Sequence, residues 1–155
     1  MDKELIFLVV LDDSSEIMNA LRYAAQRSAI NNGRVALLYT FETLEFSHWK
    51  AVEDIAEVES RKEAESKIKE FENFVLKFTS KSPKKYIMKG DRIECIINFL
   101  NANKFITNFV LAASTKESGS DPLIIAFTGK QKSKISVPMT IIPPNLTEEE
   151  IDKLS

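Results

Sequence analysis

The chain has 155 residues, of which 44% are hydrophobic and 28% charged, and it contains only four glycines and five prolines. These values are typical of one globular domain and exclude collagen-like and disordered chains. The formal net charge of −2 supplies no general attraction to nucleic acid or to an anionic membrane, so we expect neither as a partner.

The sequence shows no sign of export. Cys95 is the only cysteine, which excludes an intrachain disulfide and favours a reducing compartment. The opening Met-Asp-Lys-Glu is acidic where a secretory signal is basic, and no apolar run reaches the ~20 residues that span a bilayer. The sequence therefore predicts a cytoplasmic protein.

The first predicted element is a strand that is buried on both faces. Residues 5–11 form an unbroken apolar run, as in the middle of a parallel sheet that helices cover. Asp12 follows at its carboxyl end, where open α/β sheets bind ligands. Ser14 or Ser15 can cap the next helix, and residues 35–41 form a second strand, which completes a right-handed β-α-β unit.

A long helix dominates the next stretch, residues 42–83. Its apolar positions recur at spacings of three and four, but Arg61 and Lys62 interrupt them, so we expect its first turns to project beyond the sheet or to bend away from it. The acidic segment 53–65 is interpreted as the solvated face of this helix, with a partner surface as the alternative. His48 precedes the helix without a second ligand in register, so we expect no metal site.

Three more strands are predicted in the second half of the chain. Residues 84–89 form a lysine-rich edge strand, and Asp91 caps the helix that follows it. The fourth and fifth strands cover residues 109–113 and 137–142. Strands and helices thus alternate, which predicts an α/β fold with a five-stranded parallel sheet, doubly wound, with helices on both faces.

The boundary of the domain is predicted at the two prolines after the fifth strand. Residues 1–144 form the α/β domain, and residues 145–155 form an acidic C-terminal tail. Thr147 and Glu150 have the spacing of a capping box, so the tail can form one more short helix.

The order and spacing of these features resemble the universal stress protein family over roughly residues 4–143. The similarity rests on an apolar first strand that ends in Asp12 with Ser14 two residues on, a long second crossover, Gly90 before the third helix, and a closing Ser-Val-Pro-Met-Thr-Ile-Ile-Pro. The resemblance implies the strand order 3-2-1-4-5 and frequently a dimer.

Many members of that family bind ATP through a loop after the fourth strand that carries three glycines and a hydroxyl residue. Aligned without gaps, this chain has Ala113, Lys116 and Ala126 at the glycine positions and Phe127 at the hydroxyl position. A Cβ at a phosphate loop obstructs the close approach of the backbone to the anion. Asp121 adds a carboxylate that competes with phosphate for amide donors. We therefore predict loss of tight ATP binding and no cofactor.

The alternative is an adenine-nucleotide-binding stress protein with ATP as its ligand. Asp12 matches the acidic residue that contacts the base in ATP-binding members, and Ser114 and Lys116 would contribute from the loop 114–120. Asp12 can equally form a turn with its own side chain. Both roles of Asp12 stay open at this point.

A receiver-like phosphoacceptor domain is a remote alternative. Such a domain also has five parallel strands, and Asp12 and Asp13 would supply the acidic pair after the first of them. However, no aspartate ends the predicted third strand, no lysine follows the fifth strand, and the second crossover is too long.

The sequence offers no catalytic constellation, because its one histidine and one cysteine lie far apart and no nucleophile has an evident base. The predicted function is therefore that of a non-enzymatic regulatory or scaffolding module that resembles universal stress proteins and acts through a protein partner.

The fifth strand predicts how two copies associate. In the implied strand order it lies at a sheet edge and has no charge, and such an edge invites pairing. Two edges related by a twofold axis would form a homodimer, and the tail 145–155 would cross the partner or stay in solvent. The predicted interface consists of Val137, Met139, Thr140, Ile141 and Ile142.

Overall fold

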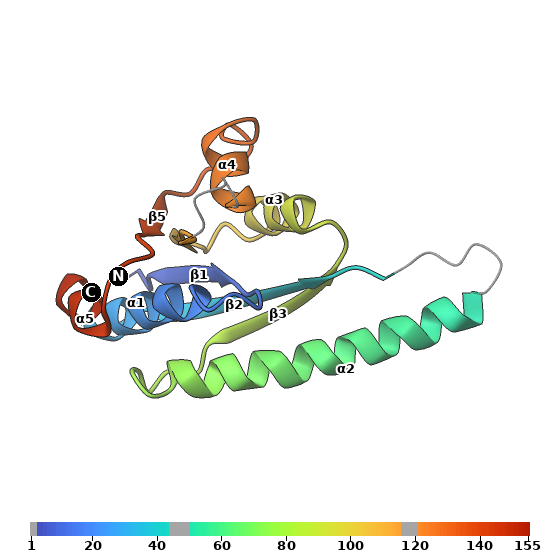
Figure 1. The fold of residues 1–155 in the computed structure, drawn as a ribbon, viewed down its shortest axis with the longest axis horizontal. Coiled ribbons are helices and arrows are strands. Elements are labelled where there is room, and N and C mark those ends of the chain that lie inside the picture. Colours follow the sequence, from blue (N-terminus) through green and yellow to red (C-terminus); the bar gives the residue numbers. More distant parts are fainter. Residues whose placement is uncertain (1–2, 44–49, 116–120) are drawn as a thin grey trace.

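The computed structural model describes residues 3–43, 50–115 and 121–155. In these parts strands and helices alternate along the chain (Figure 1). The elements are β1 (Ile6–Val10), α1 (Ile17–Ile30), β2 (Arg34–Phe41), α2 (Lys50–Val75), β3 (Lys84–Lys89), α3 (Arg92–Ala102), β4 (Asn108–Ala112), α4 (Pro122–Thr128), β5 (Met139–Ile142) and α5 (Glu148–Leu154). All neighbouring strands pair in parallel, in the order β3-β2-β1-β4-β5. The predicted α/β fold and strand order are confirmed.

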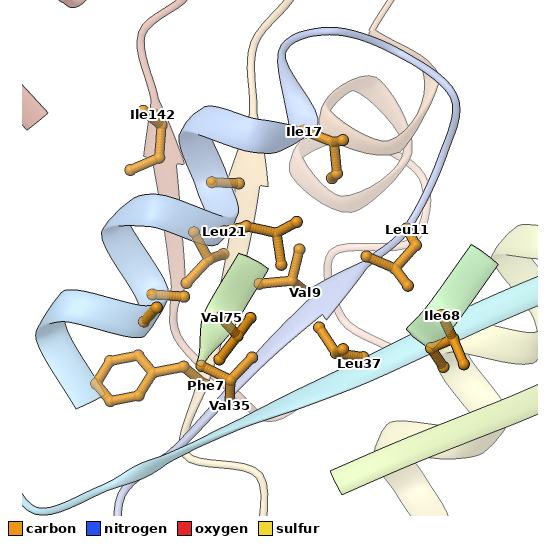
Figure 2. Close-up of a cluster of buried hydrophobic side chains, with 14 residues drawn as sticks. Phe7, Val9, Leu11, Ile17, Leu21, Val35, Leu37, Ile68, Val75 and Ile142 are labelled. Atoms are coloured by element: carbon orange, nitrogen blue, oxygen red, sulfur yellow. The ribbon is translucent and has the colours of Figure 1, made fainter. Parts of the chain in front are cut away.

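Helices cover both faces of the sheet, which explains the unbroken apolar run of the first strand. Alternate residues of a strand point to opposite faces. Phe7 and Val9 contact α1 and α2 on one face (Figure 2), whereas Leu8 and Val10 contact α3 and α4 on the other. Because neither face meets water, no polar residue interrupts β1.

Several predicted boundaries shift in the structure. The first helix begins after Glu16, and neither Ser14 nor Ser15 caps it, so that prediction was wrong. The fifth strand starts at Met139, two residues later than predicted, because the preceding Pro138 has no N–H to donate to a ladder. The cap at Asp91 is confirmed, since its carboxylate accepts a hydrogen bond from the N–H of Glu94 at 3.0 Å.

The first turns of α2 extend beyond the sheet (Figure 1), as the interrupted apolar pattern predicted. The buried residues of this 26-residue helix are Ala64, Ile68 and Val75, all in its second half. The first half therefore has little contact with the core.

The C-terminal tail folds back onto its own chain. Helix α5 begins with a complete capping box formed by Thr147 and Glu150. Ile151 is buried, and Asp152 accepts hydrogen bonds from Arg22 of α1 at 2.7 and 3.0 Å. The expectation that the tail lies across a partner or stays in solvent was therefore wrong, because α1 offers it both an apolar contact and a cation.

Candidate functional site

The candidate site lies where β1 and β4 end side by side. The chain leaves β1 toward β2 on one side and leaves β4 toward β5 on the other, so the two loops diverge. Crevices at such points are the usual ligand sites of open α/β sheets. Here a pocket of about 170 Å³ has apolar walls from both strands, α1 and α4. Its polar lining consists of Asp12, Ser14, Glu16, Arg92, Ser114 and Asp121.

Asp12 holds the turn between β1 and α1. Its Oδ1 accepts hydrogen bonds from the backbone N–H of Ser14, at 2.8 Å, and from the Ser14 hydroxyl. Its Oδ2 accepts a hydrogen bond from Nη2 of Arg92 at 3.3 Å. Of the two roles left open by the sequence, the structure therefore shows the turn.

Arg92 is a site residue that the sequence analysis missed. It is the first residue of α3, where the partial positive charge of the helix N-terminus repels a cation. That unfavourable placement was the available signal, because it indicates a carboxylate partner elsewhere, which is Asp12. Nε of Arg92 is buried and has no hydrogen-bond partner among the described residues.

Asp121 closes the base of the loop that follows β4. It precedes Pro122 at the start of α4, but its side chain does not cap that helix. Instead Oδ1 accepts a hydrogen bond from the backbone N–H of Ser114 at 2.8 Å. The structure thus brings Asp12 and Ser114 to one pocket, whereas the third predicted nucleotide residue, Lys116, lies outside the described residues.

The charge of the pocket lining is negative. Hydrogen bonds from its own backbone N–H and from Thr115 lower the pKa of Glu16, so this carboxylate is ionised at neutral pH. Three carboxylates, of Asp12, Glu16 and Asp121, face the single cation of Arg92 in the described lining. Such a lining favours hydrogen-bond donors and cations over phosphate. No group of His, Cys, Asp and Glu in the described chain could hold a metal ion.

The positions of the ATP-loop pattern have other structural roles. The N–H of Ala113 donates to the carbonyl of Ile142 at 2.9 Å, which extends the β4–β5 ladder. Phe127, at the hydroxyl position, is buried in the core and packs edge-on against Phe109 with ring centroids 5.6 Å apart. A buried phenyl ring has no hydrogen-bond donor, so Phe127 cannot bind a phosphate in the pocket as a hydroxyl would.

The predicted dimer residues divide into inner and outer positions. Val137 precedes β5 and packs, with Met139, against the α3 and α4 side of the core. Ile142 is buried on the opposite side, as Figure 2 shows. The side chain of Ile142 is thus directed into its own core and that of Val137 partly so, and the interface itself stays a prediction. Ile141 is 40% exposed, and Thr140 is half-buried beside it.

Comparison with known proteins identifies the fold. No family model matches the chain, and no curated protein matches it. Universal stress protein UspA from Lactobacillus plantarum matches with a TM-score of 0.69 and 17% identity, over 90% of this chain and 98% of that one. The hypothetical protein MJ0577 matches with a TM-score of 0.72 and 16% identity, over 94% of this chain and 99% of that one.

A third solved structure is a universal stress protein in complex with cAMP, with a TM-score of 0.61 and 11% identity, over 89% of this chain and 95% of that one. The chain therefore has the universal stress protein fold. The receiver-like alternative is wrong, because receiver domains have the strand order 2-1-3-4-5, with β3 beside β1, whereas here β3 lies at the edge next to β2.

Proposed function

We propose that this chain is a non-enzymatic, universal stress protein-like regulatory or scaffolding module whose pocket does not bind ATP tightly. The observation that carries the proposal is the hydrogen bond from the N–H of Ser114 to the carboxylate of Asp121. A phosphate loop binds its anion through backbone N–H groups that are free to donate. Here a tethered carboxylate already takes one of these donors and adds a negative charge that repels phosphate.

The size of the pocket supports the same proposal. Its volume of about 170 Å³ is below the roughly 300–1,000 Å³ of typical small-molecule sites. It is closer to the ~150 Å³ of a cavity that holds a single benzene ring. A nucleoside triphosphate is too large for this volume, so most of it would lie outside the pocket.

A second candidate function is binding of an adenine nucleotide with less phosphate charge. The cAMP complex of a protein with this fold favours it, because a cyclic monophosphate carries a single negative charge and needs fewer backbone N–H donors from a phosphate loop. Asp12, Ser114 and Lys116 are the residues of this alternative. Asp12 would then have to exchange its bond with Arg92, at 3.3 Å, for a bond to the ligand.

Calorimetric titration with magnesium ATP, and separately with cAMP, tests both candidates. The proposal predicts no saturable heat with ATP at tens of micromolar and no adenine nucleotide in the purified protein. Saturable binding of cAMP alone would favour the second candidate.

The proposed module is a homodimer that forms through β5. Within the described chain this strand pairs with β4 alone, so its outer edge has unpaired backbone groups beside the exposed Ile141. An uncharged open edge is prone to pair with another copy. Antiparallel pairing about a twofold axis would bury Ile141 against its symmetry mate. No helix in the described parts of the chain has the length and apolar character that a membrane span needs.

A further inference from the structure

The projecting half of α2 carries an apolar row on the side that faces away from the sheet. Val52, Ile55 and Val58 are 43%, 60% and 53% exposed. They succeed one another at spacings of three, so they lie along one side of the helix. The core-facing residues of the same helix, Ala64 and Ile68, point in another direction. The row therefore has no counterpart among the described residues of its own domain.

Carboxylates flank this apolar row on both sides. At 3.6 residues per turn, Asp54 and Glu65 lie on one side of the row, and Glu59 and Glu63 lie on the other. Lys62 ends the row toward the core. Across residues 50–65 the helix carries six acidic and three basic side chains.

Part of this acidity is neutralised within the helix and its neighbours. Glu57 pairs with Arg61 at 3.5 Å and with Lys89 at 3.2 Å, and Glu63 pairs with Lys67 at 3.4 Å. Asp54, Glu59 and Glu65 form no ion pair with another described residue. Of the four carboxylates that flank the row, Asp54, Glu59 and Glu65 thus remain to act on a partner, whereas Glu63 is paired with Lys67.

We propose that this surface, the α2 row of Val52, Ile55 and Val58 with Asp54, Glu59 and Glu65 beside it, binds a basic amphipathic helix of a partner protein. An apolar row with acidic flanks is complementary to a helix with an apolar stripe between lysines or arginines. A second copy of this chain would bring like charges together, and an anionic membrane would repel the same carboxylates. This surface is separate from the pocket, so the inference holds whether or not the pocket binds nucleotide.

The test uses two synthetic helical peptides of about 18 residues, long enough to be helical when bound. Both have leucines at spacings of three and four; one has lysine and the other glutamate at the remaining positions. Titration of the full chain into each peptide, followed by the fluorescence anisotropy of a dye attached to the peptide, should show saturable binding of the lysine peptide only. Binding should weaken as salt is added, since the flanking charges are exposed. Equal binding of both peptides, or of neither, would overturn the proposal.

Variants of the protein locate the surface. Ile55→Ser with Val58→Ser should weaken binding of the lysine peptide on the order of tenfold or more. Asp54→Lys with Glu59→Lys should weaken it similarly and reduce the salt dependence. Ile30→Ser, an exposed apolar residue of α1, is the matched control and should change nothing. All these side chains are exposed, so circular dichroism should be unaltered.

Unchanged affinity in Ile55→Ser with Val58→Ser would overturn the proposal. Loss of a sedimentation dimer in that same variant, with the lysine peptide bound as before, would assign the row to a second copy and overturn it as well.

Discussion

The carboxylate of Asp121 accepts a hydrogen bond from the backbone N–H of Ser114 at 2.8 Å and so joins the two ends of the loop that follows β4. The same carboxylate stands at the N-cap position of α4 yet leaves its own helix uncapped. A capping side chain normally contributes about 0.5–2 kcal/mol to stability. Helix α4 thus lacks the stability that a cap would contribute, because the Asp121 carboxylate binds the N–H of Ser114 instead.

Replacing Asp121 tests the closure of this loop. Asp121→Ala should lower the free energy of unfolding by about 1–2 kcal/mol, because it leaves the partly buried N–H of Ser114 without its acceptor. Asp121→Asn retains an oxygen acceptor and should lose less. Urea denaturation measures both, with Glu149→Ala on the exposed face of α5 as the control. An Asp121→Ala variant as stable as the unmodified chain would contradict the assigned role.

The docked tail predicts a pH-dependent contribution to stability. Hydrogen bonds from Arg22 and Gln26 lower the pKa of Asp152 to about 2. A carboxyl whose pKa is lower in the folded state stabilises the fold above its unfolded pKa, near 3.9. This contribution should be present at pH 5 and above and should disappear as the pH falls from about 4 to about 2. Carbon NMR of the Asp152 carboxyl should report the low pKa directly.

The matched variant for this prediction is Asp152→Asn, which removes the titrating group. The gap in unfolding free energy between this variant and the unmodified chain should be constant above pH 5 and should narrow on acidification. A gap that does not depend on pH would show that the Arg22 contact contributes nothing through its charge.

The open edge of β5 predicts the state of association. Ile141→Lys should convert a dimer to a monomer in sedimentation equilibrium, because pairing about the twofold axis would bring two lysines together. Ile30→Lys places the same charge on an exposed residue of α1 and should leave the dimer intact. If the unmodified chain is monomeric at every concentration, the β5 interface does not exist.

The sequence was sufficient for features that depend on local pattern. The apolar run of residues 5–11 predicted a strand covered on both faces, and the interruption at Arg61 and Lys62 predicted the projecting start of α2. The cap at Asp91 needs only residues within one turn. Each of these depends on neighbours along the chain, so one sequence is enough.

The features that the sequence analysis missed depend on contacts between segments that are distant along the chain. Arg92 meets Asp12 across 80 positions, and Arg22 meets Asp152 across 130. Asp121 precedes Pro122, which is a local signal of a helix start, but whether its carboxylate accepts a hydrogen bond from its own helix or from Ser114 depends on where β4 ends in space. Likewise, Ile142 is an apolar residue in an edge strand, and its sequence position does not say which way its side chain points. It points into the core because α1 covers that face of the sheet.

Titration of the purified chain with magnesium ATP in a calorimeter tests the central claim most directly. A companion variant with Ala113→Gly, Lys116→Gly, Ala126→Gly and Asp121→Asn restores the glycines and removes the competing charge. The account predicts no saturable heat for the unmodified chain at tens of micromolar and a gain of affinity in the companion. Stoichiometric, tight binding of ATP by the unmodified chain would contradict it.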